Sequence, residues 1–168
     1  MRSAELLAVI ALGSNLGDSA TLLREAMGRL QTFSDRPLLK SSLWQSTPVD
    51  CPPGSTLFMN AVVGLEPRPD ETPESLLGKL QSLEKEFGRG PKKILNEARA
   101  LDLDLIAFGP ETRSTASLIL PHPRAHQRRF VLQPLAEIAP DLILPGQTKT
   151  VGELLPALQT DEVLARIG

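Results

Sequence analysis

Hydrophobic residues recur along this chain with two different spacings, and these spacings separate predicted strands from predicted helices. Strict alternation is typical of a strand with one buried face, whereas apolar positions three and four apart are typical of an amphipathic helix. Apolar or alternating runs that end at glycine, proline or other turn residues predict strands over residues 8–12, 38–47, 57–66 and 101–105. A further short apolar run, "LILP", occupies residues 118–121.

Two segments carry clear signals of a helix. The first can be capped by Asp18 or Ser19 and has an apolar face made of Leu22, Ala26 and Leu30. The second opens at Thr72, which is followed by proline, and ends at Gly88. Weaker helical patterns cover residues 130–139, 151–158 and 161–167, and loop composition marks residues 13–18, 50–56 and 89–100.

The order strand, helix, strand, strand, helix, strand is that of a ferredoxin-like α/β sandwich, an α+β fold with helices packed on an antiparallel sheet. We expect the two helices to cover one face of the sheet and to leave the other face open for a binding site. No internal repeat, low-complexity tract or linker is evident, so we expect residues 1–168 to form one domain.

Composition and charge narrow the classes of function. The chain has 168 residues, 41% hydrophobic and 23% charged, which is ordinary for a globular domain with a core. Its formal net charge of −2 gives no overall attraction to nucleic acid or to an anionic membrane, so we expect neither partner. Cys51 is the single cysteine, which favours a reducing, cytoplasmic location. The run at residues 6–12 is short and follows Glu5, so it predicts a buried strand rather than a secretion signal.

The run "LDLDL" at residues 101–105 places charge on a strand, where Asp is usually rare. As a strand, it would turn its three leucines inward and place Asp102 and Asp104 on the outer face, with Cα atoms about 7 Å apart. Close carboxylates suit hard cations such as Mg²⁺, and a pair at this spacing can flank the two ions of a phosphoryl-transfer site. A solvated strand face with basic neighbours explains the spacing equally well, so the spacing by itself leaves both interpretations open.

Basic residues gather around this acidic pair. Between Arg89 and Arg129 the chain holds eight Lys and Arg but four acids, two of which are the pair itself. A charge run is usually a solvated face, yet cations around two carboxylates fit a phosphate-rich anion held through metal and gripped by arginine. The loop "GSNLG" at residues 13–17 lacks the lysine and spacing of a P-loop, and alone it predicts a tight turn.

Six stretches resemble the sequence of one family, in order and with compatible spacing from about Ala8 to Pro145. They are "ALGSNLGD", "SSLWQSTPVD", "FMNAVVGLE", "LQSLEKEFGR", "RALDLDLIAFG" and "LPHPRAHQRRFVLQPLAEIAPDLILP". The family is 6-hydroxymethyl-7,8-dihydropterin pyrophosphokinase of folate biosynthesis, which transfers pyrophosphate from ATP to the pterin's hydroxymethyl oxygen and releases AMP. The resemblance implies this activity, two Mg²⁺ ions bound with ATP, small-molecule substrates and a monomeric chain.

The resemblance also implies roles for particular residues. Asp102 and Asp104 match the Mg²⁺ ligands, and together with Arg89 and Arg99 they form the implied catalytic group. The implied pterin-binding residues are two aromatic walls, an amide and the end of a strand: Phe58, Phe130, Asn60, Ser46, Thr47, Pro48 and Val49. The implied ATP-binding residues are Gln81, Glu84, Arg89, Arg99, Leu105, His122, Arg124 and Arg128. Residues 89–100 are expected to close over ATP as a loop.

Two other functions remain open on the sequence. A ferredoxin-like module could bind RNA or a small effector on an open sheet face, although this chain has six aromatic residues, no tyrosine and a negative net charge. A family member could instead bind pterin or nucleotide without transferring anything. The segment "NEAR" at residues 96–99 lacks the proline of the commoner family pattern, and Leu95 stands where many members carry arginine.

Overall fold

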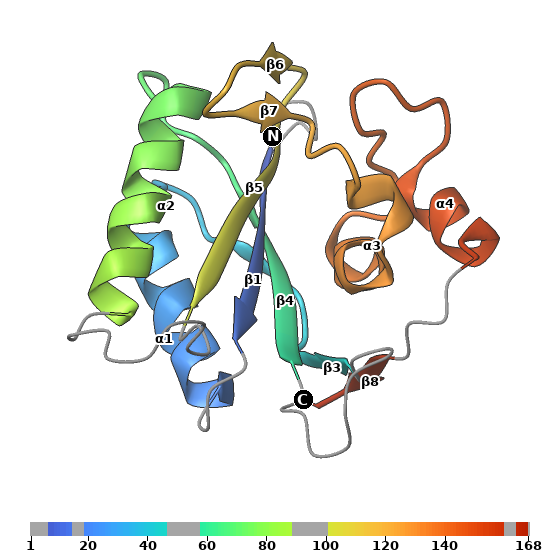
Figure 1. The fold of residues 1–168 in the computed structure, drawn as a ribbon, viewed down its shortest axis with the longest axis horizontal. Helices are drawn as coiled ribbons and strands as arrows, with labels where there is room; N and C mark the ends of the chain where they lie inside the picture. The colour runs from blue at the N-terminus through green and yellow to red at the C-terminus, as the bar shows by residue number, and fades with distance from the viewer. Residues whose placement is uncertain (1–6, 15–18, 47–57, 89–100, 160–163, 168) are drawn as a thin grey trace.

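The computed structural model describes residues 7–14, 19–46, 58–88, 101–159 and 164–167. Within this part of the chain, helices lie on both sides of one antiparallel sheet (Figure 1). The element order and topology confirm the predicted ferredoxin-like α+β fold.

The main sheet has the strand order β5-β1-β4-β3-β8, and β2 also pairs with β4. The strands are β1 (Ala8–Ser14), β2 (Leu39–Lys40), β3 (Trp44–Ser46), β4 (Phe58–Leu65), β5 (Asp102–Phe108) and β8 (Leu164–Arg166). Because β1 is antiparallel to both of its neighbours, β4 and β5 run parallel and begin at the same end of the sheet. Gly13 lies opposite Asn60 on one side and opposite Asp102 on the other, so residues from these two strand starts meet across β1.

The two helices with clear sequence signals are confirmed, and they cover one face of the sheet (Figure 1). They are α1 (Ser19–Gln31) and α2 (Pro73–Phe87). The hydroxyl of Thr72 caps α2, accepting a hydrogen bond from the Ser75 N–H at 3.0 Å. Beneath these helices lies the larger core, which includes Leu23, Leu30, Leu76, Leu80, Leu83 and Leu103. Each buried side chain of this size stabilises the fold by about 1.5–3 kcal/mol, so this layer holds β5 firmly in the sheet.

The expectation of an open second face is wrong for most of the sheet. The helices α3 (Arg129–Ile138) and α4 (Val151–Ala157) lie on that side (Figure 1). They enclose a second core with residues of the central strands, among them Val9, Ala11, Val62, Ile106, Val131, Leu132 and Leu135. Strands buried on both faces carry continuous apolar runs, and "AVIA" and "LIA" are such runs. The outer face of β5 stays accessible at its start: Asp104 is exposed, whereas Ile106 is 1% exposed.

The strand predicted over residues 38–47 is divided into β2 and β3. Lys40 lies opposite Val63 and Trp44 lies opposite Asn60. The segment from β2 to β3 therefore contains one residue more than the part of β4 that it faces. Within this irregularity, the Ser41 N–H donates to the Val62 carbonyl at 3.0 Å, and the Ser41 hydroxyl accepts from the Val62 N–H at 2.9 Å. An extra residue of this kind bends a strand and changes the direction of the residues after it, which here form β3.

The end of the chain follows the prediction in one element and departs from it in the next. The helix predicted at residues 151–158 is confirmed as α4, but the helix predicted at residues 161–167 is wrong, because residues 164–166 form β8 against β3. Short helices are marginal in isolation, whereas an edge strand offers unpaired backbone groups to a neighbouring segment. Long-range pairing therefore decides the structure of this segment.

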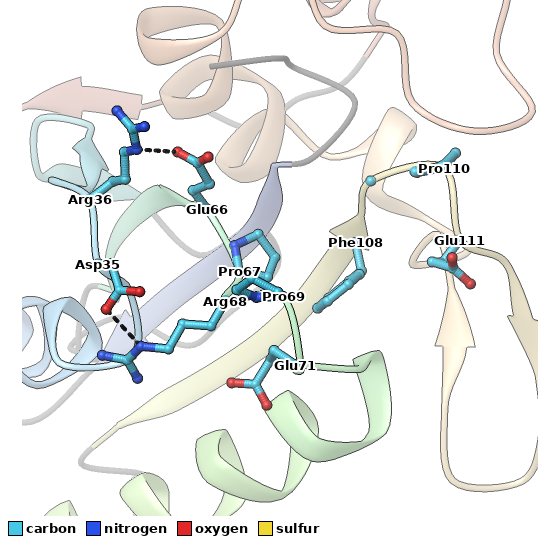
Figure 2. Close-up of a pocket in the computed structure, with 11 residues that line it drawn as sticks. Asp35, Arg36, Glu66, Pro67, Arg68, Pro69, Glu71, Phe108, Pro110 and Glu111 are labelled. Atoms are coloured by element: carbon cyan, nitrogen blue, oxygen red, sulfur yellow. Dashed lines mark hydrogen bonds and ion pairs between the residues drawn. The ribbon is translucent and has the colours of Figure 1, made fainter. Parts of the chain in front are cut away.

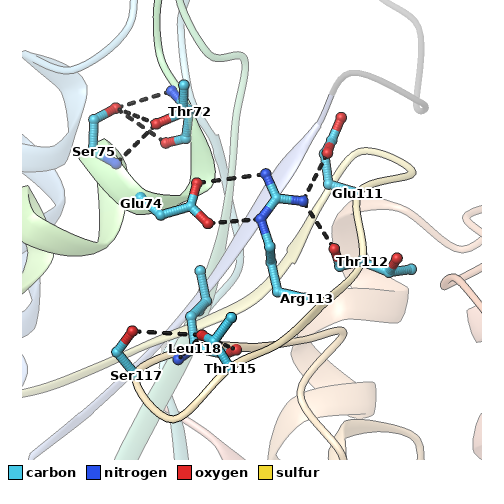
Figure 3. A network of polar contacts seen from close by, with 9 residues as sticks. All are labelled: Thr72, Glu74, Ser75, Glu111, Thr112, Arg113, Thr115, Ser117 and Leu118. Carbon is cyan, nitrogen blue, oxygen red and sulfur yellow. Dashed lines mark hydrogen bonds and ion pairs between the residues drawn. The ribbon is translucent and has the colours of Figure 1, made fainter.

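A small hairpin leads from β5 toward the segment that carries His122. It consists of β6 (Arg113–Ser114) and β7 (Ile119–Leu120), and a short 3-10 helix comes next at Ala125–Gln127. The Arg113 guanidinium binds Glu74 on α2 at 2.6 Å and Glu111 at 2.9 Å (Figure 3). The ion pair with Glu74 holds the hairpin against the first turn of α2. In the part of the chain that the structure describes, every helix is too short or too polar to cross a membrane.

Candidate functional site

The acidic pair lies at the start of β5, as the alternation predicted. Asp102 is half-buried and Asp104 is exposed, while Leu101, Leu103 and Leu105 are 4–5% exposed. Opposite Asp102, on β1, stands a glycine, Gly13, where a Cβ would come 3.5 Å from the Asn60 amide oxygen and 4.0 Å from the Asp102 Cβ. The absence of a side chain there keeps the space between the starts of β4 and β5 clear.

Glu84 holds the main chain between the two aspartates. β5 is an edge strand of the described sheet, and its Leu103 N–H donates to the Glu84 carboxylate on α2 at 2.8 Å. A buried N–H without a partner costs about 1–3 kcal/mol, so this contact stabilises the edge of the strand. Glu84 was expected beside the nucleotide on resemblance alone. Its bond to the strand that carries the acidic pair depends on how α2 packs, and no sequence signal indicated it.

The start of β4 carries an exposed ring and a buried amide. Phe58 is 43% exposed, which is unusual for a phenyl ring, while Asn60 on the same side of the strand is 8% exposed. The Asn60 amide nitrogen donates to the Ser46 hydroxyl at 3.0 Å, which links β4 to the end of β3. Three of the residues predicted for pterin binding, Ser46, Phe58 and Asn60, are therefore neighbours in the sheet.

The first turn of α3 brings another predicted aromatic residue to the sheet. Phe130 is half-buried and packs at the margin of the second core, and α3 lies against β4. The guanidinium carbon of Arg128 stands 5.4 Å from the centroid of the Phe130 ring, a cation–π distance. Since Arg128 was predicted to bind ATP and Phe130 to bind pterin, this contact puts one predicted residue of each set side by side.

His122 is tied to β5, and its surroundings favour the uncharged ring. The backbone N–H of His122 donates to the Ile106 carbonyl at 2.8 Å. Burial lowers the pKa of His122 below its ordinary value of 6.5, and the nearby Arg128 and Arg124 also lower it, while Asp104 opposes the shift. The His122 Nδ1 accepts from the backbone N–H of Arg124 at 3.3 Å, a contact that favours the neutral tautomer with its proton on Nε2. The resemblance implied that His122 binds ATP, and a neutral ring in this geometry would donate to a phosphate through its Nε2–H.

The remaining predicted residues fall into three groups. Gln81 and Arg124 are exposed, on α2 and at the start of the 3-10 helix. Leu105 belongs to the larger core, so its side chain faces away from the outer surface of β5. Five predicted residues lie outside the described part of the chain: Thr47, Pro48, Val49, Arg89 and Arg99.

A pocket of about 630 Å³ lies at the other end of the sheet (Figure 2). It is lined by the segment after β4, with Pro67 and Pro69, and by the end of β5, with Phe108. Since β4 and β5 are parallel, their ends lie away from the acidic pair at their starts. Two ion pairs form between residues that line the pocket, Arg68–Asp35 at 2.9 Å and Arg36–Glu66 at 3.6 Å. This pocket is therefore separate from the site of the acidic pair.

The fold and the site define a class of protein: a ferredoxin-like α+β protein whose accessible strand start combines an acidic pair with basic side chains, a layout that suits metal-bound phosphates. Comparison with known proteins gives the family. The sequence model of 7,8-dihydro-6-hydroxymethylpterin-pyrophosphokinase (HPPK) matches residues 9–140. The chain belongs to this family.

Curated relatives agree with the family match. The chain is 40% identical over 133 residues to the 2-amino-4-hydroxy-6-hydroxymethyldihydropteridine pyrophosphokinase of Bacillus subtilis, covering 79% of this chain and 77% of the relative. Identity to the Haemophilus influenzae protein of the same name is 39% over 140 residues, covering 83% and 85%. The match to the folic acid synthesis protein fol1 of Pneumocystis carinii, 39% over 139 residues, covers 81% of this chain but 18% of that protein.

Solved structures share the fold at low identity. A Plasmodium falciparum HPPK-DHPS structure superposes with a TM-score of 0.70 at 14% identity, covering 90% of this chain and 45% of that one. At 14% identity, the similarity between the two structures shows a shared fold and nothing about function. The chain therefore spans less than half of the Plasmodium chain and a small part of the Pneumocystis protein, but about three quarters or more of the two bacterial relatives.

Proposed function

We propose that this chain transfers pyrophosphate from ATP to the hydroxymethyl oxygen of 6-hydroxymethyl-7,8-dihydropterin, giving AMP and the pterin diphosphate in folate biosynthesis. The observation that carries the proposal is the outward-facing pair Asp102 and Asp104 at the start of β5, in a chain of the HPPK family. The rival interpretation as an RNA-binding module needs an open sheet face, and α3 and α4 occupy most of that face.

The acidic pair fits magnesium that arrives with a nucleotide. Two carboxylates supply hard oxygen ligands, and Mg²⁺ is usually held by one or two carboxylates together with substrate phosphates. In the described ranges, no group of three or more His, Cys, Asp or Glu could hold a metal ion. Asp102 and Asp104 would hold two Mg²⁺ together with ATP oxygens. When bound, Mg²⁺ would neutralise triphosphate charge and lower the pKa of the attacking hydroxyl.

The pterin would bind at the neighbouring start of β4. A ring of its size suits the exposed face of Phe58, with Phe130 as the second wall, and aromatic pairs contribute about 0.5–1.5 kcal/mol beyond the area they bury. One N–H of the Asn60 amide donates to Ser46. The amide oxygen and the second N–H are the groups that would contact the pterin edge. Thr47, Pro48 and Val49 would continue this edge contact.

The transfer would be a single in-line displacement. The hydroxymethyl oxygen attacks the β-phosphorus, the bond from that phosphorus to the bridging α,β-oxygen breaks, and AMP leaves with the bridging oxygen while the hydroxyl proton is released to solvent. The Nε2–H of His122 and the guanidinium of Arg128 would donate to phosphate oxygens as charge shifts onto them. We propose the same role for Arg89, Arg99 and Arg124, with Gln81 beside the nucleotide.

The direct test is to incubate the chain with Mg²⁺, the dihydropterin and ATP labelled at the β-phosphorus. The expected products are AMP and a pterin diphosphate that carries the label. Formation of ADP and a pterin monophosphate would show simple phosphoryl transfer, and AMP release that does not depend on pterin would show hydrolysis. Either result, or no turnover at all, contradicts the proposed function.

We further propose that the protein acts on these small molecules as a cytoplasmic monomer, without nucleic acid or membrane. The single cysteine and the net charge of −2 support this location and partner set. Light scattering of the purified chain tests the oligomeric state directly.

A further inference from the structure

Glu137 forms a compact polar cluster that no part of the proposed function uses. Its carboxylate accepts three hydrogen bonds, from the Ser42 N–H at 2.9 Å, from the Ser42 hydroxyl at 2.5 Å and from the Trp44 indole N–H at 3.2 Å. Glu137 lies in the last turn of α3, whereas Ser42 and Trp44 lie more than ninety positions earlier, at the entry to β3. The cluster therefore joins two elements that are distant in sequence.

These two elements carry the two halves of the proposed pterin site. The first turn of α3 carries Phe130, about 10 Å along the helix from Glu137 at 1.5 Å per residue. β3 ends at Ser46, two residues after Trp44, and Ser46 accepts from Asn60. A hydrogen-bonded cluster between a helix and a strand fixes both as rigid units, so it also sets the separation of the side chains that they carry.

The cluster is built around a charged acceptor. Burial would raise the pKa of Glu137, but the hydrogen bonds from Ser42 and Trp44 outweigh it, and the positive charge of Arg166 on β8 acts in the same direction, so the pKa lies below its ordinary value. Hydrogen bonds to an ionised carboxylate are shorter and stronger than neutral ones. The ionised form is therefore the one that holds the two elements together.

We propose that Glu137 is a positioning residue for pterin binding: by anchoring the end of α3 to the entry of β3, it sets Phe130 on one side of the ring and Ser46 with Asn60 at its edge. This inference rests on the proposed function and adds a determinant of pterin affinity to it. Among the proposed ATP-binding residues, the acidic pair and His122 lie on other elements, and Arg128 is the N-cap residue of α3, beside Phe130. We therefore expect the affinity for ATP to depend on this anchor much less than the affinity for pterin does.

The test compares the affinities of the two substrates in Glu137→Ala. The dissociation constant of 6-hydroxymethylpterin, monitored by its fluorescence, is expected to rise about ten-fold, which corresponds to about 1.4 kcal/mol. The dissociation constant of ATP with Mg²⁺ is expected to stay within about two-fold, and so is kcat at saturating substrates. Glu137→Gln keeps one acceptor oxygen and should restore part of the pterin affinity.

Two further variants separate positioning from a general loss of stability. Trp44→Phe removes one donor and keeps an aromatic ring, so it should weaken pterin binding in the same direction by a smaller factor. Glu153→Ala is the matched control: Glu153 is also exposed, also accepts a backbone N–H, from Thr150 at 2.8 Å, and also has a lowered pKa, but it caps α4. Its Tm should fall while the affinity for pterin stays unchanged.

The outcomes are distinct. If Glu137→Ala and Trp44→Phe both keep pterin affinity within two-fold, or if the affinities for pterin and ATP fall together, Glu137 has a general structural role and the inference is overturned. Should Glu137→Ala fail to fold, Trp44→Phe with the same comparison decides. A wild-type chain that binds pterin but releases no AMP contradicts the proposed function while leaving the positioning role intact. A wild-type chain that binds no pterin overturns both.

Discussion

At the scale of single residues, the neighbours of each titratable group determine what that group can do. Asp102 and Asp104 face outward because their strand alternates, and the leucines between and beside them are buried. His122 sits where burial and two arginines lower its pKa, with Asp104 near enough to oppose them. The acidic pair and the histidine thus share one electrostatic environment, in which the carboxylates suit metal and the imidazole suits neutral hydrogen bonding.

Replacing either aspartate with asparagine should nearly abolish transfer. Asp102→Asn and Asp104→Asn keep the side-chain size but remove a charged oxygen ligand, and loss of one preorganised electrostatic group typically costs about 100- to 1,000-fold in kcat. The measurement is AMP release at saturating Mg²⁺, with Tm as the control for folding. Wild-type turnover in either variant would show that the pair does not hold the metal.

The lowered pKa of His122 predicts how stability changes with pH. The unfolded chain takes up a proton near the ordinary pKa of 6.5, whereas the folded chain does so at a lower pH. The contribution of His122 to stability is therefore present above the unfolded pKa and is lost as pH falls through the folded pKa. Urea unfolding from about pH 7 down to about pH 5 should show wild type losing more stability than His122→Gln. Parallel curves would contradict the assignment.

At the scale of elements, contacts between distant segments hold the site in place. α2 reaches β5 through Glu84, α3 reaches the entry to β3 through Glu137, and β3 reaches β4 through Ser46 and Asn60. Each contact joins an element that carries a predicted site residue to another that does so. The starts of β4 and β5 are brought together by β1, which is antiparallel to both.

Loss of the Glu84 contact should raise the Mg²⁺ concentration that the reaction requires without changing the affinity for pterin. In Glu84→Ala the Leu103 N–H loses its acceptor, and a hydrogen bond of this kind contributes about 0.5–1.5 kcal/mol, or roughly two- to thirteen-fold in an equilibrium constant. The Mg²⁺ concentration for half-maximal AMP release should rise by about that factor. Ser82→Ala, at an exposed position on the same helix, is the control. An unchanged Mg²⁺ requirement, or an equal loss of pterin affinity, would contradict this role.

At the scale of the whole molecule, two cores on opposite faces of one sheet leave a limited region for binding. The larger core lies under α1 and α2, and the second lies under α3 and α4. The outer face of β5 changes from exposed at Asp104 to buried at Ile106 within two residues. The protein therefore places its charged site at the margin of the second core, where the first turn of α3 also brings Phe130.

Binding of ATP should stabilise the whole fold, and only when Mg²⁺ is present. A ligand at a hundred times its Kd adds about 2.7 kcal/mol to the free energy of unfolding. For a domain of this size, this corresponds to a rise in Tm of about 5–10 °C. Thermal unfolding with ATP and Mg²⁺, and again after EDTA, measures the difference. A rise in Tm that survives EDTA would show that ATP binds without the metal.

The sequence by itself determined the features that depend on local spacing and local chemistry. Alternation, caps and breaks predicted α1, α2 and the outward direction of Asp102 and Asp104. The roles of Phe130 and Arg128 came from the resemblance of "HPRAHQRRFVLQPLAEIA" to the family, and they stay predictions. Only the tertiary structure decided the covering of the second face, the pairing of β8 and the partners of Glu84 and Glu137. The reason is physical: these features depend on contacts between residues far apart in the chain, which local periodicity does not encode.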